Sequence, residues 1–399
     1  MKPRVLVVSN LFPNAHDPQR GTYLRQLVDR LGDCYEIRVV APVPWMPRIA
    51  ARVLDSNVNL AERETYVGTK VYHPRYFVIP KAMRFLHGLT LGWSLRRLFK
   101  SIHVEFPFEL ISVHWMYPDA YAATLANRGS DIPVVCHALG CDINEYLRFP
   151  LRRQMIRWSL RHSSAIVTKS QELADKIGEL LGNSANLNVI YNGIDREMFH
   201  PIDKKEARRS VGFELDSTVV LFVGNLAPEK AISVLLEAFA QIVSRPLSIA
   251  LYIVGDGPLE RQLKSQSDAL GLSDFVTFLG KVPHRRISTY LNAADVLCLP
   301  SLREGCPNVV LESLACGTAV VASAVGAVPE MVSRAKNGFL VRPGDVADLA
   351  EKLQAAVRRS SDGTCEFHWP SWEENAESVG EVFDACLADA ASTRNHVLD

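Results

Sequence analysis

The sequence lacks any hydrophobic run long enough to cross a membrane, although 48% of its 399 residues are hydrophobic. A membrane-spanning helix needs about 20 consecutive apolar residues, and no stretch approaches that length. The apolar run Val5–Val8, which follows Lys2 and Arg4, is too short for a signal sequence and predicts a first buried strand. We therefore expect a globular protein of the cytoplasm rather than one that spans a membrane.

The sequence also lacks a cysteine pattern typical of disulfides or zinc sites. Its eight cysteines are scattered, mostly in apolar runs, and even Cys136 and Cys141 make no convincing ligand pair. Free thiols in a reducing compartment are the expected state.

Net charge is absent as well, because 44 basic residues balance 44 acidic ones. Residues 1–200 nevertheless carry 25 basic and 18 acidic residues, an excess of +7. The rest of the chain carries 19 basic and 26 acidic residues, or −7. This asymmetry favours an anionic partner for the first half, such as a membrane surface or an acidic glycan. A chance spread of surface charge explains it equally well. We expect no nucleic-acid partner.

What the sequence does contain is two series of short apolar runs that alternate with helical patterns. The first series has runs at 5–9, 37–41, 110–113, 133–136, 165–168 and 187–190. The second has runs at 219–223, 247–254, 276–279, 296–299 and 319–322. Such runs between helices predict parallel sheets built from βαβ units. The expected fold is α/β, with two doubly wound, Rossmann-like domains facing across a cleft.

The domain limits follow from the polar stretch 192–216, which separates the two series, and from the helical pattern after about Trp369. We expect an N-terminal domain over 1–195, a C-terminal domain over 196–370 and a helical tail over 371–399.

The most informative segment contains Glu304 and Glu312, eight positions apart. Glu304 lies in a turn after a buried strand, and Glu312 lies in a short helix that ends near Gly317. A helix N-terminus suits phosphate, and a carboxylate beside it can accept hydrogen bonds from sugar hydroxyls. The structural alternatives are that Glu304 caps the helix and that Glu312 is a buried carboxylate with a protein partner.

Two further loops follow strands of the second series. Gly224–Lys230 precedes a helix, so Lys230 can reach a bound diphosphate; a solvated surface lysine is the alternative. Gly255–Pro258 lacks the third glycine of the dinucleotide fingerprint, and a tight turn accounts for it fully.

The second half resembles the retaining glycosyltransferases of family 4, which have the GT-B fold of glycogen synthase. The Glu304-to-Glu312 element is similar to the family's E-x7-E motif, with Leu-Pro-Ser before it and Ala-Cys-Gly after it. The other blocks similar to the family's are Gly224–Lys230, Gly255–Pro258, Phe278–Gly280, Pro329-Glu330 and Asn337–Val341. They stand in the family's order over residues 219–345. The first half is similar at Gly21, around His137 and at Tyr191–Asp195.

The resemblance implies a donor site for a nucleotide-sugar. Glu304 would hydrogen-bond the donor sugar, Glu312 would accept from the ribose hydroxyls, and Lys230 would neutralise the diphosphate. The other implied donor positions are the backbone N–H groups of Asn308, Val309 and Val310, Gly21 and Asn225 near the diphosphate, and Val282 near the base.

His137 would contact the transferred sugar through its carbonyl or its ring. His114 also follows a strand and is the alternative, and either histidine can be a satisfied structural residue. Asn225 and Ala231 depart from the family, since many members have Arg and Gly there, and the diphosphate site is then one cation short. Arg303 or Arg20 could supply that charge.

The implied activity is retaining hexosyl transfer, with a UDP-sugar favoured over a GDP-sugar by family frequency. The acceptor would be a glycan or a lipid-linked glycan in surface polysaccharide or glycoconjugate assembly. No metal or other cofactor is implied, because the nucleotide-sugar is a substrate. A sugar-nucleotide epimerase and an inactive GT-B partner protein are the alternatives, although the first half shows no dense carboxylate cluster that an epimerase would need.

The stretch Arg84–Lys100 mixes basic residues with large apolar ones, and Trp45 is a further aromatic of this half. It fits a helix lying on a membrane surface, which would place the protein at the inner face of the cell membrane. A helix packed on its own domain is the alternative.

Overall fold

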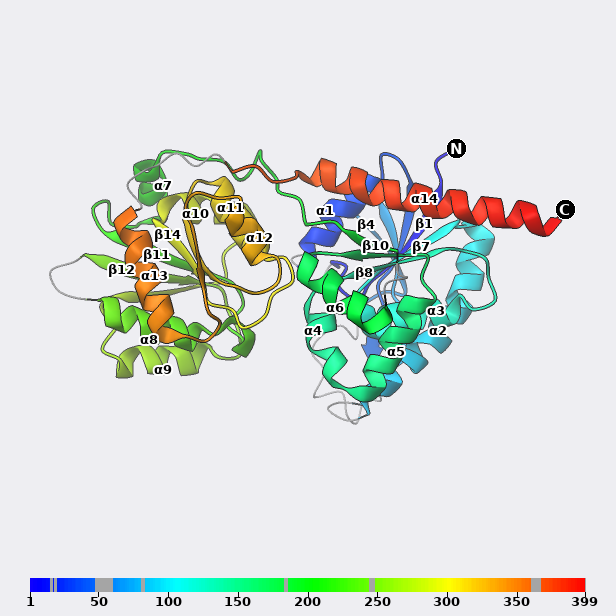
Figure 1. The fold of residues 1–399 in the computed structure, drawn as a ribbon, viewed down its shortest axis with the longest axis horizontal. Coiled ribbons are helices and arrows are strands. Elements are labelled where there is room, and N and C mark those ends of the chain that lie inside the picture. The colour runs from blue at the N-terminus through cyan, green and yellow to red at the C-terminus, as the bar shows by residue number, and fades with distance from the viewer. Residues whose placement is uncertain are drawn as a thin grey trace. The chain divides into compact units, whose positions relative to one another are not determined.

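The computed structural model describes residues 1–14, 17, 20–46, 60–79, 83–182, 186–243, 248–359 and 367–398. The chain forms two compact units, one made of Met1–Asn192 with Trp372–Asp399 and the other of Gly193–Ser371. We call them the N-terminal and the C-terminal unit. Each contains a sheet of mainly parallel strands with helices on both faces (Figure 1). The predicted α/β fold with two Rossmann-like domains is confirmed.

The sheet of the N-terminal unit has the strand order β10-β9-β8-β7-β1-β2-β5-β4. Its strands are β1 (Arg4–Val8), β2 (Glu36–Val40), β4 (Arg63–Tyr66), β5 (Thr69–Tyr72), β7 (Leu110–His114), β8 (Val134–Ala138), β9 (Ala165–Thr168) and β10 (Leu187–Val189). Neighbours pair in parallel except β4 and β5, which are antiparallel. β4 and β5 were not predicted from the sequence, because half-exposed strands at a sheet edge carry no continuous apolar run.

Helices cover both faces of this sheet. α1 (Thr22–Leu31) and α14 (Trp372–Leu398) share a core with Val5 and Val7 of β1. On the other face, Leu6 and Val8 share a core with α2 (His87–Glu105), α5 (Pro150–Arg161) and α6 (Gln171–Leu181). A short helix, α3 (Tyr121–Ala126), also packs there.

The tail predicted as helical is α14, and it belongs to the N-terminal unit although it follows the C-terminal unit in sequence. Phe383 is fully buried there, with its ring 5.6 Å from that of Tyr35. Arg30 of α1 forms an ion pair with Glu373 at 2.6 Å. The last helix thus completes the core that the first helix begins.

The C-terminal unit has a six-stranded parallel sheet with the order β13-β12-β11-β14-β15-β16. Its strands are β11 (Thr218–Val223), β12 (Ile249–Val254), β13 (Val276–Gly280), β14 (Val296–Leu299), β15 (Ala319–Ser323) and β16 (Gly338–Val341). Its helices are α7 (Lys204–Val211), α8 (Ile232–Ile242), α9 (Glu260–Ala269), α10 (Ile287–Ala293), α11 (Asn308–Ala315), α12 (Val328–Ser333) and α13 (Val346–Arg359). The chain winds outward from β11 to β13, returns to β14 beside β11, and winds outward in the other direction. Such a reversal leaves a crevice at the carboxyl ends of the two central strands, where doubly wound sheets bind ligands.

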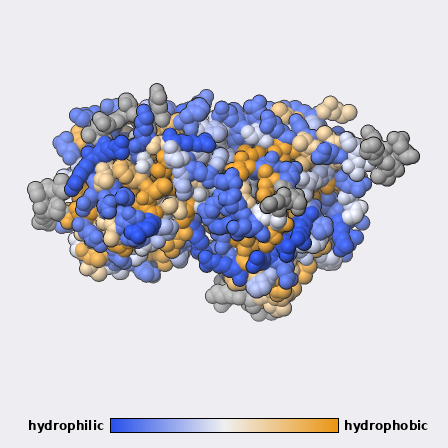
Figure 2. Space-filling model, in the orientation of Figure 1, coloured by the Kyte–Doolittle hydropathy of each residue, from blue (hydrophilic) through white to orange (hydrophobic). Residues whose placement is uncertain are grey.

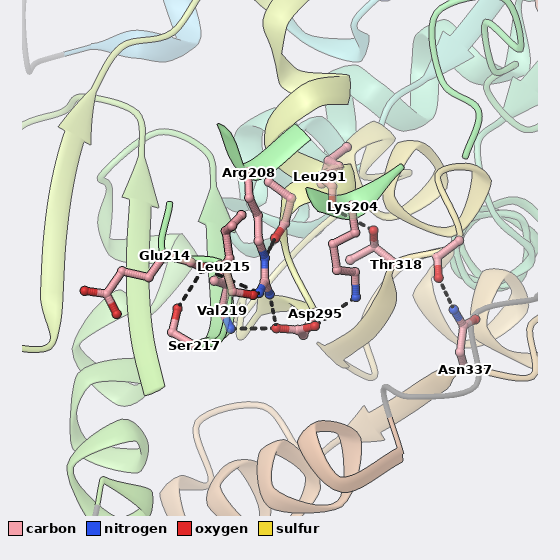
Figure 3. Close-up of polar contacts among 12 residues, drawn as sticks. Lys204, Arg208, Glu214, Leu215, Ser217, Val219, Leu291, Asp295, Thr318 and Asn337 are labelled. Carbon is pink, nitrogen blue, oxygen red and sulfur yellow. Dashed lines mark hydrogen bonds and ion pairs between the residues drawn. The ribbon is translucent and has the colours of Figure 1, made fainter. Parts of the chain in front are cut away.

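A network of buried charges fixes α7 against this sheet (Figure 3). Asp295, just before β14, accepts from Lys204 Nζ at 2.8 Å and from Arg208 Nη2 at 2.7 Å. It also accepts from the N–H of Val219 at 2.7 Å. The Arg208 and Asp295 side chains are only 5% and 12% exposed, so each charge depends on its partner.

The visible face of the molecule is mostly hydrophilic, with hydrophobic residues in separate patches (Figure 2). None of the helices in the described ranges combines the length and the apolar character that crossing a bilayer requires.

Candidate functional site

Two loops of the C-terminal unit meet at the strand-order reversal. One follows β11 and ends in the short helix Pro228–Lys230, and the other connects β14 to α11. The N–H of Leu302 donates to the carbonyl of Glu229 at 2.8 Å, which ties the two loops together. Lys230 ends the first loop and Glu304 lies in the second, whereas Glu312 lies in α11, the helix that follows the second loop.

Lys230 and Glu304 form an ion pair, with Nζ 2.6 Å from Oε1. Their side chains are only 21% and 11% exposed, so the pair is poorly solvated and well fixed. A fixed ammonium beside a fixed carboxylate can bind a phosphate and a sugar hydroxyl side by side.

The backbone at Glu304 is supported by Gly326, which the sequence analysis missed. Gly326 has φ +56°, and a Cβ built on it would lie 2.4 Å from the carbonyl oxygen of Gly305 and 2.6 Å from that of Glu304. The next residue, Ala327, donates its N–H to Gly305 O at 2.8 Å. A side chain at Gly326 would therefore displace the loop; a glycine shortly after the strand 319–322 was the available signal.

Glu312 lies on α11, is 8% exposed and accepts a hydrogen bond from His284 Nε2 at 3.1 Å. This hydrogen bond raises the pKa of His284 above its usual 6.5, against the opposing effect of partial burial. The sequence analysis did not single out His284, although it lies two residues after the predicted Val282. Glu312 thus has the protein partner that a buried carboxylate requires.

The three backbone positions Asn308, Val309 and Val310 form the first turn of α11. The N–H of Val310 donates to Pro307 O at 3.0 Å, so this group is already in use within the turn. Asn308 and Val309 are partly exposed.

Asn225 and Val282 lie near the same sheet edge, after β11 and β13 respectively. Asn225 is exposed, and its Oδ1 lies 2.7 Å from where a Cβ on Gly257 would stand. Ala231 adopts φ +48°, a left-handed conformation that explains why glycine is common at this position in the family the sequence resembles.

The remaining predicted residues belong to the N-terminal unit. Gly21 immediately precedes α1 and has φ +54°, and a Cβ there would lie 1.9 Å from Leu11 O, so only glycine fits. His137 is the last residue but one of β8, and its ring is fully buried. The rings of His137 and the alternative, His114, are stacked with their centroids 3.9 Å apart. Ser112 Oγ lies within hydrogen-bond distance of both rings, 3.1 Å from His137 Nε2 and 3.2 Å from His114 Nε2.

Burial keeps this histidine pair neutral. It lowers the pKa of each ring well below its usual value, and nearby Lys169 lowers both further. The His137 carbonyl accepts from the N–H of Trp115 at 3.2 Å. Among the described residues, the His137 carbonyl and Nε2 are thus engaged in protein contacts, whereas Nδ1 is buried without a hydrogen-bond partner. The catalytic role of His137 stays a prediction.

Two buried carboxylates at the same edge of the N-terminal sheet escaped the sequence analysis as site residues. Asp142 accepts from the N–H groups of Met116 and Gly140 at 2.9 and 2.8 Å. Asp119 accepts from the N–H of Asn10 at 2.9 Å. Burial raises the pKa of Asp119 to about 7 and that of Asp142 to about 6.

Within the described ranges, no group of three or more His, Cys, Asp or Glu side chains is placed to hold a metal ion.

Comparisons with known proteins match both halves of the chain to glycosyltransferase families. A family model described as "Glycosyl transferases group 1" matches residues 203–364, and "Glycosyltransferase Family 4" matches 21–198. The putative teichuronic acid biosynthesis glycosyltransferase TuaC of Bacillus subtilis is 26% identical, over 88% of each chain. N-acetyl-alpha-D-glucosaminyl L-malate synthase of Bacillus anthracis is 28% identical, over 69% of this chain and 71% of the relative.

Solved structures show the same fold. Sucrose-phosphate synthase from Thermosynechococcus elongatus superposes with a TM-score of 0.76 at 21% identity, covering 100% of this chain and 99% of that one. Anabaena Alr3699/HepE in complex with UDP gives a TM-score of 0.67 at 20% identity, covering 99% and 100%.

Proposed function

Because the chain belongs to the GT-B glycosyltransferases of family 4, we propose that it transfers a hexose from a UDP-sugar, with retention, to a glycan or lipid-linked acceptor. Glycosyltransferase activity in glycan biosynthesis follows from the family. The proposal of hexose transfer from a UDP-sugar with retention depends above all on the Lys230–Glu304 ion pair at the strand-order reversal.

In the proposed donor complex, Lys230 turns from Glu304 to the diphosphate, and the first turn of α11 adds its partial positive charge. Glu304 then accepts hydrogen bonds from the hydroxyls of the donor sugar. Glu312, held by His284, accepts from the ribose hydroxyls. Asn225 donates a hydrogen bond to the diphosphate in place of the arginine of many relatives, and Val282 lies beside the base.

The proposed reaction breaks the bond between the anomeric carbon and the diphosphate oxygen. The acceptor hydroxyl oxygen bonds to that carbon on the same face, and its proton passes to the departing diphosphate. Positive charge develops on the sugar and negative charge on the leaving group. Lys230 and the α11 N-terminus stabilise the leaving group, and no resident metal is needed.

The choice of UDP is supported by the nucleotides seen with structural neighbours. Alr3699/HepE has been solved with UDP and with UDP-glucose, although starch synthase IV of Arabidopsis thaliana has been solved with ADP. A glycan acceptor is supported by TuaC, which is named for teichuronic acid biosynthesis.

The test is thermal stabilisation and donor hydrolysis with UDP-, GDP- and ADP-glucose in the presence of EDTA. We expect stabilisation by the UDP-sugar only, and loss of hydrolysis in Lys230→Ala. The matched control is Lys264→Ala, which removes an exposed lysine paired with Glu260 on α9. Stabilisation by GDP- or ADP-glucose instead would correct the nucleotide, and full turnover in Lys230→Ala would contradict the proposed site. Anomeric configuration of the product, read by NMR, tests retention.

A further inference from the structure

A groove of about 960 Å³ lies on the N-terminal unit, between α2 and a separate two-stranded sheet. This small sheet pairs β3 (Val43–Trp45) with β6 (Arg75–Phe77), and it follows the parallel strands β2 and β5 beyond their carboxyl ends. Thr90 Oγ1 of α2 donates to Phe77 O at 2.8 Å, and Ser94 Oγ donates to Arg75 O at 3.1 Å. The two sides of the groove are therefore fixed to each other.

Large aromatic side chains line this groove and remain exposed. Trp45 and Phe77 are cross-strand partners with ring centroids 6.4 Å apart, and they are 39% and 42% exposed. Trp93 of α2 lines the groove too and is 66% exposed. Exposed apolar groups gathered in a concave site mark a binding surface, and flat rings match the apolar C–H faces of sugars.

The charges in the groove are mainly positive. The guanidinium carbon of Arg97 lies 4.3 Å from the centroid of the Trp93 ring, and this contact orients the guanidinium N–H groups. Arg63 and Arg75 also line the groove, and Arg63 already forms an ion pair with Glu105 at 3.6 Å. Glu62 is the one acidic side chain among the described lining residues. Guanidinium groups bind carboxylates through two parallel hydrogen bonds.

We propose that this groove binds a segment of a carboxylated glycan chain, with the aromatic rings stacking on sugar faces and the arginines pairing with the carboxylates. Its volume lies at the upper end of the roughly 300–1,000 Å³ typical of ligand sites, enough for several sugar units. A membrane surface fits less well, because the exposed aromatics line a hollow and because Leu91 and Leu95 of α2 face the core.

The proposal rests on the proposed glycan acceptor but uses different residues. The groove belongs to the N-terminal unit, whereas Lys230, Glu304 and Glu312 belong to the C-terminal unit. Glycan binding can therefore be measured without donor, and donor binding without glycan.

The experiment is calorimetric titration of the full chain with an octamer of galacturonic acid and with neutral maltooctaose. Trp93→Ala and Arg97→Ala are compared with Arg96→Ala, a neighbouring exposed arginine of α2 outside the groove lining. We expect about tenfold weaker binding of the acidic octamer in the first two variants, because tryptophan and arginine anchors dominate binding sites. Arg96→Ala should bind as the wild type does, and maltooctaose should bind the wild type more weakly than the acidic octamer.

Three results would overturn the proposal: no binding of the acidic octamer by the wild type, equal losses in Arg96→Ala and Arg97→Ala, or equal binding of both octamers. Sedimentation with phosphatidylglycerol vesicles tests the membrane directly. Vesicle binding lost in the groove variants, with octamer binding unchanged, would also overturn it. Thermal stabilisation by UDP, measured on every variant, reports separately on the proposed function.

Discussion

At the scale of single residues, the site depends on partners that the sequence does not pair. Lys230 and Glu304 are 74 positions apart, and Glu312 and His284 are 28 apart, yet both pairs are in contact. The E-x7-E spacing predicted where the carboxylates stand but gave no information on which cations hold them. Which distant side chains come into contact depends on the order of the strands in the sheet. That order cannot be read from the pattern of residues in one sequence.

The Lys230–Glu304 pair competes with the diphosphate for the same ammonium. Glu304→Gln keeps the shape of the side chain and removes its charge, so Lys230 becomes available to the nucleotide. We expect at least about fivefold tighter binding of UDP, because this poorly solvated pair should be worth no less than the ~1 kcal/mol upper value of an exposed one. Donor turnover should fall nevertheless, because the sugar hydroxyls lose a charged acceptor. Calorimetry with UDP is the measurement, and weaker UDP binding in this variant would show that the pair does not compete.

The His284–Glu312 pair makes stability depend on pH. The pKa of His284 is raised in the folded chain above the usual 6.5, so the pair stabilises fully below that value. Its contribution is lost as pH rises through the raised pKa. The melting temperature of Glu312→Gln should therefore fall furthest below that of the wild type near about pH 6 and approach it by about pH 9. In a His284→Gln background the difference should not vary with pH; a pH dependence that persists there would exclude His284 as its source.

At the scale of elements, buried strands were predictable and edge elements were not. β11 and β14 are continuous apolar runs buried on both faces, and both runs agree with the structure. β3 and β6 are three residues each and half exposed, and they contain Pro44 and Arg75, so no pattern indicated them. The groove that these short strands form was invisible in the sequence for the same reason.

Lys204 and Arg208 of α7 both form ion pairs with the carboxylate of Asp295, so the effect of burial can be compared for two cations with one partner. Asp295→Ala removes the carboxylate that pairs with the 5% exposed Arg208, which keeps only hydrogen bonds to backbone carbonyls. We expect a loss of about 3 kcal/mol in the free energy of unfolding. Lys204→Ala removes the other cation, which is 41% exposed, and should cost at most about 1 kcal/mol. Urea denaturation measures both. Equal losses in the two variants would mean that burial does not decide the contribution of these charges.

At the scale of the whole molecule, the chain leaves its first unit, builds the second and returns. The sequence predicted a terminal helical tail but not which unit it joins, because the apolar positions of α14 look the same against either sheet. The answer lies in tertiary contacts: Phe383 packs on Tyr35, whose hydroxyl donates to Gly380 O at 3.0 Å.

Truncation should affect the stability of the two units differently, because the N-terminal unit is built from two separate segments of the chain and the C-terminal unit from one. The C-terminal unit is one continuous segment, so residues 193–371 should fold alone and be stabilised by UDP, with the stabilisation lost in Glu312→Gln. A chain ending at residue 371 lacks α14 and exposes the core around Tyr35 that Phe383 covers in the full chain, so its N-terminal unit should unfold at a lower temperature. Phe383→Ala in the full chain should cost about 3–5 kcal/mol, the usual cost of removing a buried phenylalanine. Calorimetric scans of the four chains test this. Unchanged melting of the N-terminal unit without α14 would show that the helix only covers a core that is already complete.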